Sequence, residues 1–137
     1  MEKIGFKSAR CPYCNEGIVN ITEAYDSSEE DLKKKAYLDL DHFFPKSSNP
    51  FFALSFFNLV PSCHHCNSTE KSDKEFSIES HINPFDKTFD DIYLFSLDKN
   101  SFKIVIRRKD GKPIGKHNNI VDLNLINRYN DDFDPEC

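Results

Sequence analysis

Hydrophobic and polar residues alternate between Tyr37 and Phe44, with leucines on one face of the segment and aspartates on the other. Alternation of this kind predicts a β-strand. Pro45 then favours an end to the strand, because proline cannot donate to a sheet. A regular strand would send Asp41 and His42 to opposite faces. If both residues serve one site, the strand must end, bulge or twist there.

Shorter patterns predict the other elements of an α+β fold. We expect strands at Ile18–Ile21 and Leu59–Val60 (the latter ended by Pro61), a hairpin of Tyr93–Leu97 with Phe102–Ile106, a helix from Cys63 to about Lys74, and a helix on Ile120, Leu123 and Ile126.

Two further segments are read from their composition. Ser27–Ala36 is polar and is expected to be an exposed helix or loop with Ser28 as its N-cap. Phe51–Phe57 is rich in phenylalanine and is expected to lie in the core.

The composition favours one soluble domain spanning residues 1–137. The chain has 137 residues, of which 38% are hydrophobic and 30% charged, enough for one modest core. The apolar run from Phe51 to Val60 is interrupted by Ser55 and Asn58 and falls short of the roughly 20 residues of a membrane helix. The first ten residues lack an apolar signal core. We therefore expect no membrane partner, a cytoplasmic location and reduced thiols.

The net charge of −5 argues against a protein that binds nucleic acid by bulk electrostatics. Basic residues nevertheless gather between Ser101 and His117, where six lysines and arginines accompany one acid, Asp110. Such a local patch can hold phosphates, although a solvated surface is the commoner interpretation.

Two C-x-x-C pairs are the strongest chemical signal. Cys11 and Cys14 are separated by 48 residues from Cys63 and Cys66. Four thiolates are the ligand set of a tetrahedral structural Zn²⁺, and this interpretation is favoured over redox or incidental cysteines. Cys137 is the odd cysteine. The pairs predict a zinc knuckle that clamps the N-terminal segment onto the helix beginning near Cys63.

A second group of residues has side chains of the types that hydrolysis of a phosphodiester requires. Asp41 and Asn67 offer the oxygen ligands that Mg²⁺ or Mn²⁺ prefers. His42 has a side chain whose ordinary pKa suits deprotonation of a water. Taken alone, the Asp41-His42 pair is a surface pair more often than a catalytic one, and Asn58 is an ordinary turn residue.

The order of these motifs resembles the HNH (ββα-metal) endonucleases, which are metal-dependent hydrolases. The matching pieces are D-H-x-x-P, N-L-V and C-x-x-C-N, in that order. Asp39–Ser47 is especially similar to the HNH domain of RNA-guided CRISPR effectors, as are the nine-residue step from Asn58 to Asn67 and the following Lys71-Ser-Asp73. The resemblance covers about Cys11 to Asp73, roughly half of the chain.

The resemblance implies a ββα-metal core at about residues 8–76 and an extension at about 77–137. His42 would be the general base, Asn58 would hold the loop that orients it, and Asp41 and Asn67 would bind one catalytic Mg²⁺ or Mn²⁺. That metal would stabilise charge on the scissile phosphate and the leaving 3′ oxygen, so the product would carry a 5′ phosphate. Lys46 and Lys71 are candidate phosphate contacts. The core would dock on the backbone of DNA.

The C-terminal half, through Ile82–Asp86 and Leu123–Arg128, resembles small bacterial HNH proteins encoded beside ABC-type ATPases in Septu-like anti-phage systems. That resemblance implies DNA as substrate, a defence role and an ATPase partner that contributes DNA affinity.

Two other functions stay open from the sequence alone. A zinc-stabilised module could bind nucleic acid or protein without chemistry, and plasmid nicking with and without EDTA would separate it from an enzyme. An HNH ribonuclease is the other alternative, which a comparison of DNA and RNA substrates would resolve.

Overall fold

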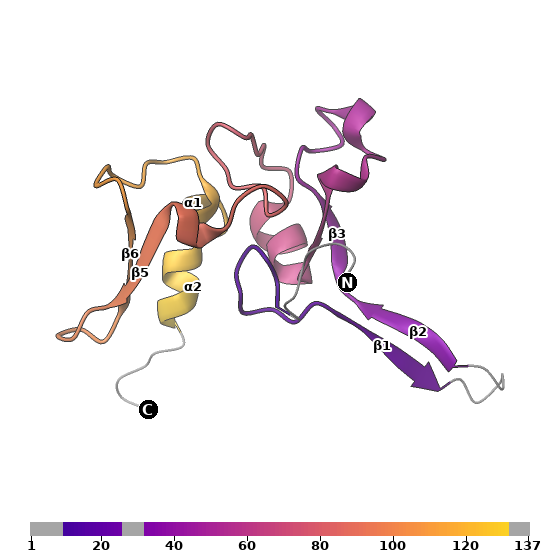
Figure 1. Cartoon of the computed structure of the whole chain (residues 1–137), viewed down its shortest axis with the longest axis horizontal. Helices are drawn as coiled ribbons and strands as arrows, with labels where there is room; N and C mark the ends of the chain where they lie inside the picture. The colour runs from indigo at the N-terminus through magenta and orange to yellow at the C-terminus, as the bar shows by residue number, and fades with distance from the viewer. Residues whose placement is uncertain (1–9, 26–31, 132–137) are drawn as a thin grey trace. The chain divides into compact units, whose positions relative to one another are not determined.

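The computed structural model describes residues 10–25 and 32–131 (Figure 1). The chain divides into two compact units, residues 1–73 and 74–137. In the described part, three separate two-stranded antiparallel sheets accompany short helices, which gives an α+β protein. No helix in that part has the length and apolar character needed to cross a bilayer.

The first hairpin of unit 1 joins β1 (Asn20–Tyr25) to β2 (Leu32–Tyr37). Ile18 precedes β1 and forms only an isolated bridge with Arg10, so the strand lies later than predicted. The expectation of a helix or loop at Ser27–Ala36 is wrong for its described part, which belongs to β2; Ser27 and Ser28 lie outside the described residues. Pairing with β1 overrides the polar composition of this segment, since strand preference depends on context.

The second hairpin of unit 1 leads directly into a helix. β3 (Asp39–His42) pairs with β4 (Leu59–Ser62), and the helix η4 (His65–Lys71) contacts β3. Pro61 lies inside β4 opposite Leu40 and does not end the ladder. A two-stranded sheet accommodates proline because every strand in it is an edge strand.

Helix η4 ends earlier than the sequence indicates. Ser72 takes a left-handed φ of +44°, and its N–H donates to the carbonyl of Asn67 at 3.0 Å. That bond spans five residues, so the turn is wider than an α-helical turn. Wide turns of this kind gather at functional sites more often than elsewhere in helices.

The core of unit 1 consists of the cysteine turns and the β3–β4 hairpin. Its buried side chains are Cys11, Tyr13, Cys14, Val19, Phe43, Ala53, Val60 and Cys66. The expectation that Phe51–Phe57 is core is wrong, because in this segment only Ala53 is buried. Two short 3₁₀ turns, η2 (Pro50–Phe52) and η3 (Phe56–Asn58), leave the phenylalanine rings exposed.

Unit 2 contains the predicted hairpin, with β5 (Tyr93–Leu97) paired to β6 (Ile104–Arg108), preceded by the short turn η5 (Phe89–Asp91). The predicted single helix is broken into α1 (Asn119–Asp122) and α2 (Leu125–Asp131).

The break between α1 and α2 lies at Asn124, which has a φ of +53°. It rotates the second helix, so Leu125 becomes buried while Ile126 stays 40% exposed. A continuous helical pattern would have buried Ile126 instead.

Two polar side chains tie the turn around residue 82 to α1. Asn119 accepts from the Ile82 N–H at 2.6 Å and donates to its carbonyl at 3.2 Å. His81 stacks on Phe76 with ring centroids 4.1 Å apart, and its Nε2 donates to Asp122 at 2.7 Å. These bonds take the place of regular secondary structure between the turn and the helix.

Replacing Asn119 by alanine should destabilise unit 2 by about 2 kcal/mol or more, because it leaves two buried backbone groups of Ile82 without their partner. The measurement is the midpoint of urea unfolding of the zinc-loaded chain. Asn127→Ala is the matched control, since Asn127 is exposed, and it should change stability by less than about 0.5 kcal/mol. Equal midpoints for the two variants would contradict this role for Asn119.

Candidate functional site

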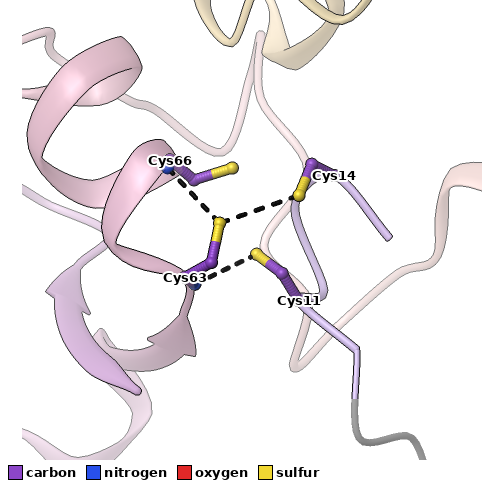
Figure 2. A group of neighbouring side chains, drawn as sticks. All are labelled: Cys11, Cys14, Cys63 and Cys66. Carbon is purple, nitrogen blue, oxygen red and sulfur yellow. Dashed lines mark hydrogen bonds between the residues drawn. The ribbon is translucent and has the colours of Figure 1, made fainter. Parts of the chain in front are cut away.

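The four cysteines come from two distant parts of unit 1 and converge on one point (Figure 2). Cys11 and Cys14 lie in the turn before β1, whereas Cys63 and Cys66 flank the start of η4. All four Sγ atoms lie within 4.8 Å of one another. The Cys14 and Cys63 sulfurs are 3.8 Å apart, and a tetrahedron with Zn–S bonds of about 2.3 Å has S···S edges of about 3.8 Å. The donor set therefore fits Zn²⁺ in number, chemistry and spacing.

Backbone amides surround the sulfurs as they would surround thiolates. The Cys63 N–H donates to Cys11 Sγ at 3.3 Å, the Gly17 N–H to Cys14 Sγ at 3.4 Å, and the Cys66 N–H to Cys63 Sγ at 3.5 Å. Gly17 also lies against the cluster. A Cβ added at Gly17 would lie 2.4 Å from the Cys63 Cβ and 2.7 Å from its Sγ, so only glycine fits there.

The four thiols do not ionise independently. Hydrogen bonds from Cys11 hold the pKa of Cys14 far below its usual value and lower the pKa of Cys63 to about 6. The same mutual hydrogen bonding raises the pKa of Cys11, chiefly through Cys14, and of Cys66, chiefly through Cys11. A bound divalent cation would favour the thiolate form of all four cysteines, because a sulfur ligand must be deprotonated.

His42 ends β3 and points its ring at the loop that follows. Its Nε2 lies 3.0 Å from the carbonyl of Ala53. Because a carbonyl only accepts, Nε2 carries the proton in this bond and Nδ1 is left as a base. The side chain is only half-buried, so Nδ1 belongs to a ring that solvent reaches.

Asn58 holds that loop together at both ends. It is 3% exposed, and its Oδ1 accepts from the Phe44 N–H at 2.7 Å. Its Nδ2 donates to the carbonyls of Phe44 and Phe52, both at 3.1 Å. The backbone carbonyl of Asn58 also accepts from the Phe43 N–H at 2.9 Å. Asn58 thereby fixes the segment that presents the Ala53 carbonyl to His42.

Asp41 lies inside unit 1 on the opposite face of β3. It is 3% exposed, the Tyr13 hydroxyl donates to its Oδ2 at 2.7 Å, and the Lys71 Nζ lies 3.2 Å from its Oδ1. Burial raises the pKa of Asp41, which the charge of Lys71 opposes. Burial likewise lowers the pKa of Lys71, and the charge of Asp41 opposes that shift.

Lys71 also donates to the His42 carbonyl at 2.6 Å. With 1% of its surface exposed, its ammonium group is inside the unit and not at the surface where a phosphate contact was expected. Lys46, the other candidate phosphate contact, is exposed.

Asn67 hydrogen-bonds Asp39, whereas it was expected to bind a metal ion together with Asp41. Its Nδ2 donates to Asp39 Oδ2 at 3.0 Å, and the His64 Nδ1 lies 2.8 Å from the same oxygen. The Asn67 hydrogen bond is the main reason that the pKa of Asp39 is lowered. Asp39 was not among the assigned ligands. The sequence could have indicated Asp39, because residues two positions apart on a strand point to the same face. Asp39 and Asp41 both lie on the face of β3 toward η4.

The expected catalytic trio is therefore divided between two faces of β3. Asp41 bonds Tyr13 and Lys71, Asn67 bonds Asp39, and His42 bonds the loop. β3 stays regular through His42, so the alternation of faces is kept at the Asp41-His42 pair. Within the described residues, the cysteines form the only group of three or more His, Cys, Asp or Glu side chains close enough to hold a metal.

Comparison of the chain with protein-family models, with curated proteins and with solved structures returned no match. The geometry itself establishes an α+β chain with a four-cysteine group that could hold a metal ion such as zinc. Any assignment of chemistry rests on the contacts around His42, Asn58 and Asn67.

Cys66→Ser and Gly17→Ala should both lower the zinc content of the purified chain well below the expected value of about one per chain. The first removes one of four ligands, and the second puts a methyl group against Cys63. Zinc is measured by elemental analysis of the protein after gel filtration.

Cys137→Ser is the matched control, because Cys137 belongs to neither C-x-x-C pair and lies outside the described residues. It should retain the zinc. Loss of zinc from this control, or full zinc in Cys66→Ser, would contradict the four-cysteine site.

Proposed function

We propose that the chain is a metal-dependent endonuclease of the HNH type that hydrolyses phosphodiester bonds in DNA. One observation carries the proposal: the loop fixed by buried Asn58 presents the Ala53 carbonyl to His42. A histidine held by one ring nitrogen, with the other left as an acceptor, has the form of a general base. The β3–β4–η4 order beside a four-cysteine group supports the same function.

His42 would take a proton from the attacking water at Nδ1. The Nε2–H bond to Ala53 keeps the ring in one orientation and one tautomer. Proton transfer to a positioned side chain typically contributes about 10²–10⁴-fold to the rate. The loop thus prepares the base before substrate arrives.

Asn67 and the carboxylates of β3 would hold the catalytic cation. Asp41 is the ligand that the HNH pattern implies, and Asp39 is the carboxylate in contact with Asn67. Carboxylate and amide oxygens suit Mg²⁺ or Mn²⁺. When bound, that cation supplies positive charge for the phosphate oxygens. Lys71 supports this side of β3, since it bonds both the Asp41 carboxylate and the His42 carbonyl.

Unit 2 would supply contacts to the DNA backbone. Lys103, Arg107, Lys109, Lys112 and Lys116 are exposed between residues 101 and 117. Arg108 is instead engaged by Asp110, with Nη2 and Oδ2 2.7 Å apart. With a net charge of −5, the chain would gain DNA affinity from a partner, for which the ABC-type ATPase of an anti-phage system is our proposal.

His42→Ala should reduce plasmid cleavage in Mg²⁺ or Mn²⁺ by about 10²-fold or more, because it removes the general base. Zinc content and unfolding midpoint should stay those of the parent chain. His117→Ala is the control, since His117 is an exposed histidine of unit 2, and it should cleave normally. A fully active His42→Ala enzyme would refute the assignment. A parent chain that binds DNA and never cleaves it would favour a binding module.

Asn67→Ala and Asp39→Asn should each raise the Mg²⁺ concentration for half-maximal cleavage by about tenfold or more, as loss of a cation ligand does. Neither should change the unfolding midpoint greatly, because both side chains are only half-buried. Asp41→Asn should also lower that midpoint, since it leaves the buried Lys71 without its charge partner.

The measurement is a Mg²⁺ titration of the initial cleavage rate, with Asn127→Ala as the control for loss of an amide. An unchanged titration for Asp39→Asn would remove Asp39 from the cation site, and an unchanged titration for Asn67→Ala would remove Asn67.

A further inference from the structure

The loop between β3 and β4 carries exposed apolar side chains, and its Ala53 carbonyl contacts His42. We call residues 50–57 the aromatic loop. Its exposed fractions are 96% for Phe51, 50% for Phe52, 94% for Leu54, 54% for Phe56 and 70% for Phe57. Exposed apolar side chains that gather in this way mark an interaction site more often than chance.

The aromatic loop is held by hydrogen bonds although its rings are exposed. The Ala53 N–H donates to the Pro50 carbonyl at 3.3 Å, and the Asn58 N–H donates to the Ser55 carbonyl at 3.0 Å. The side chain of Asn58 also donates to the Phe52 carbonyl at 3.1 Å. The rings therefore stand on an ordered backbone, so little further ordering is needed when something binds them.

The charge around the aromatic loop suits a polyanion. Residues 42–69 contain no aspartate or glutamate, although the chain has 23 acids in all. The same stretch holds Lys46 and His42, and also His64 and His65, whose rings lie against Asp39 and Glu70. In a chain with a net charge of −5, the aromatic loop and its neighbours in sequence carry no acid, which favours nucleic acid as the occupant.

We propose that the aromatic loop stacks on unpaired bases of the DNA strand being cut, so that the preferred substrate is single-stranded or locally unpaired DNA. Bases in a duplex are stacked on each other, and aromatic side chains reach their faces only when the strand is open. Ala53 lies within the loop and bonds His42, so a base seated there lies beside the proposed general base. The inference rests on the proposed function, because it assigns the substrate of that same site.

The test replaces two exposed rings by leucine in the full zinc-loaded chain. The Phe51→Leu, Phe57→Leu double variant keeps an apolar surface and removes the two most exposed rings of the loop. Phe51→Trp keeps an aromatic ring at position 51. Phe102→Leu is the matched control, because Phe102 is 59% exposed in unit 2. Binding is measured by fluorescence anisotropy with a labelled oligonucleotide as single-stranded DNA, as duplex and as single-stranded RNA, with Ca²⁺ replacing Mg²⁺.

The parent chain should bind single-stranded DNA more tightly than duplex. The double variant should bind the single strand about tenfold more weakly, in line with stacking on a protein ring, and should leave duplex binding unchanged. Phe51→Trp and Phe102→Leu should bind as the parent does. Unchanged zinc content and unfolding midpoint would show that the double variant is folded.

Parental binding of the single strand by the double variant would overturn the proposal, and would assign the surface to an apolar protein partner instead. Equal or tighter binding of duplex or of RNA by the parent chain would overturn it as well. Cleavage with Mg²⁺ separates the two proposals. A chain that cuts DNA equally well with and without the rings keeps the nuclease and loses the stacking. A chain whose single-strand binding needs the rings, but which never cuts, keeps the stacking and loses the nuclease.

Discussion

The convergence of four thiols is the constraint on which unit 1 depends. It joins two turns that lie 48 residues apart, and the second of these turns begins the helix that carries Asn67 and Lys71. The core around it is small, with few large apolar side chains fully buried. In zinc-finger peptides, zinc binding contributes about 10–16 kcal/mol to the free energy of folding. That exceeds the stability that so small a hydrophobic core supplies. A metal held by the four cysteines would therefore tie the start of η4 to the turn before β1.

The two faces of β3 carry different groups of side chains. On the face toward η4, the buried pair of Asp41 and Lys71 links the strand to the helix, with Tyr13 bonding the same carboxylate from the cysteine turn. Breaking a buried charge pair by removing one partner is strongly destabilising. The pair thus ties β3 to the C-terminal end of η4. The opposite face leads to His42 and the loop.

The parts of the fold that depend on local pattern could be predicted, whereas those that depend on tertiary pairing could not. The β5–β6 hairpin follows from alternation around a turn. β2 could not be found in the polar Ser27–Ala36 segment, because its partner strand is what makes it a strand. Phenylalanine content indicated a core at Phe51–Phe57, yet Phe43 and Val60 fill those interior positions and the hydrogen bonds of Asn58 turn the segment outward.

The candidate site could be predicted in its residue types but only partly in its contacts. The cysteine spacing identified all four members of the group that could hold a metal ion, because four thiolates are the ligand set of a tetrahedral zinc site. The choice between Asp39 and Asp41 needed coordinates, since both lie on one face and only the position of η4 decides which of them Asn67 reaches. His42 is the last residue of β3, and its contact with the Ala53 carbonyl depends on the fold of the loop, which the sequence pattern does not specify.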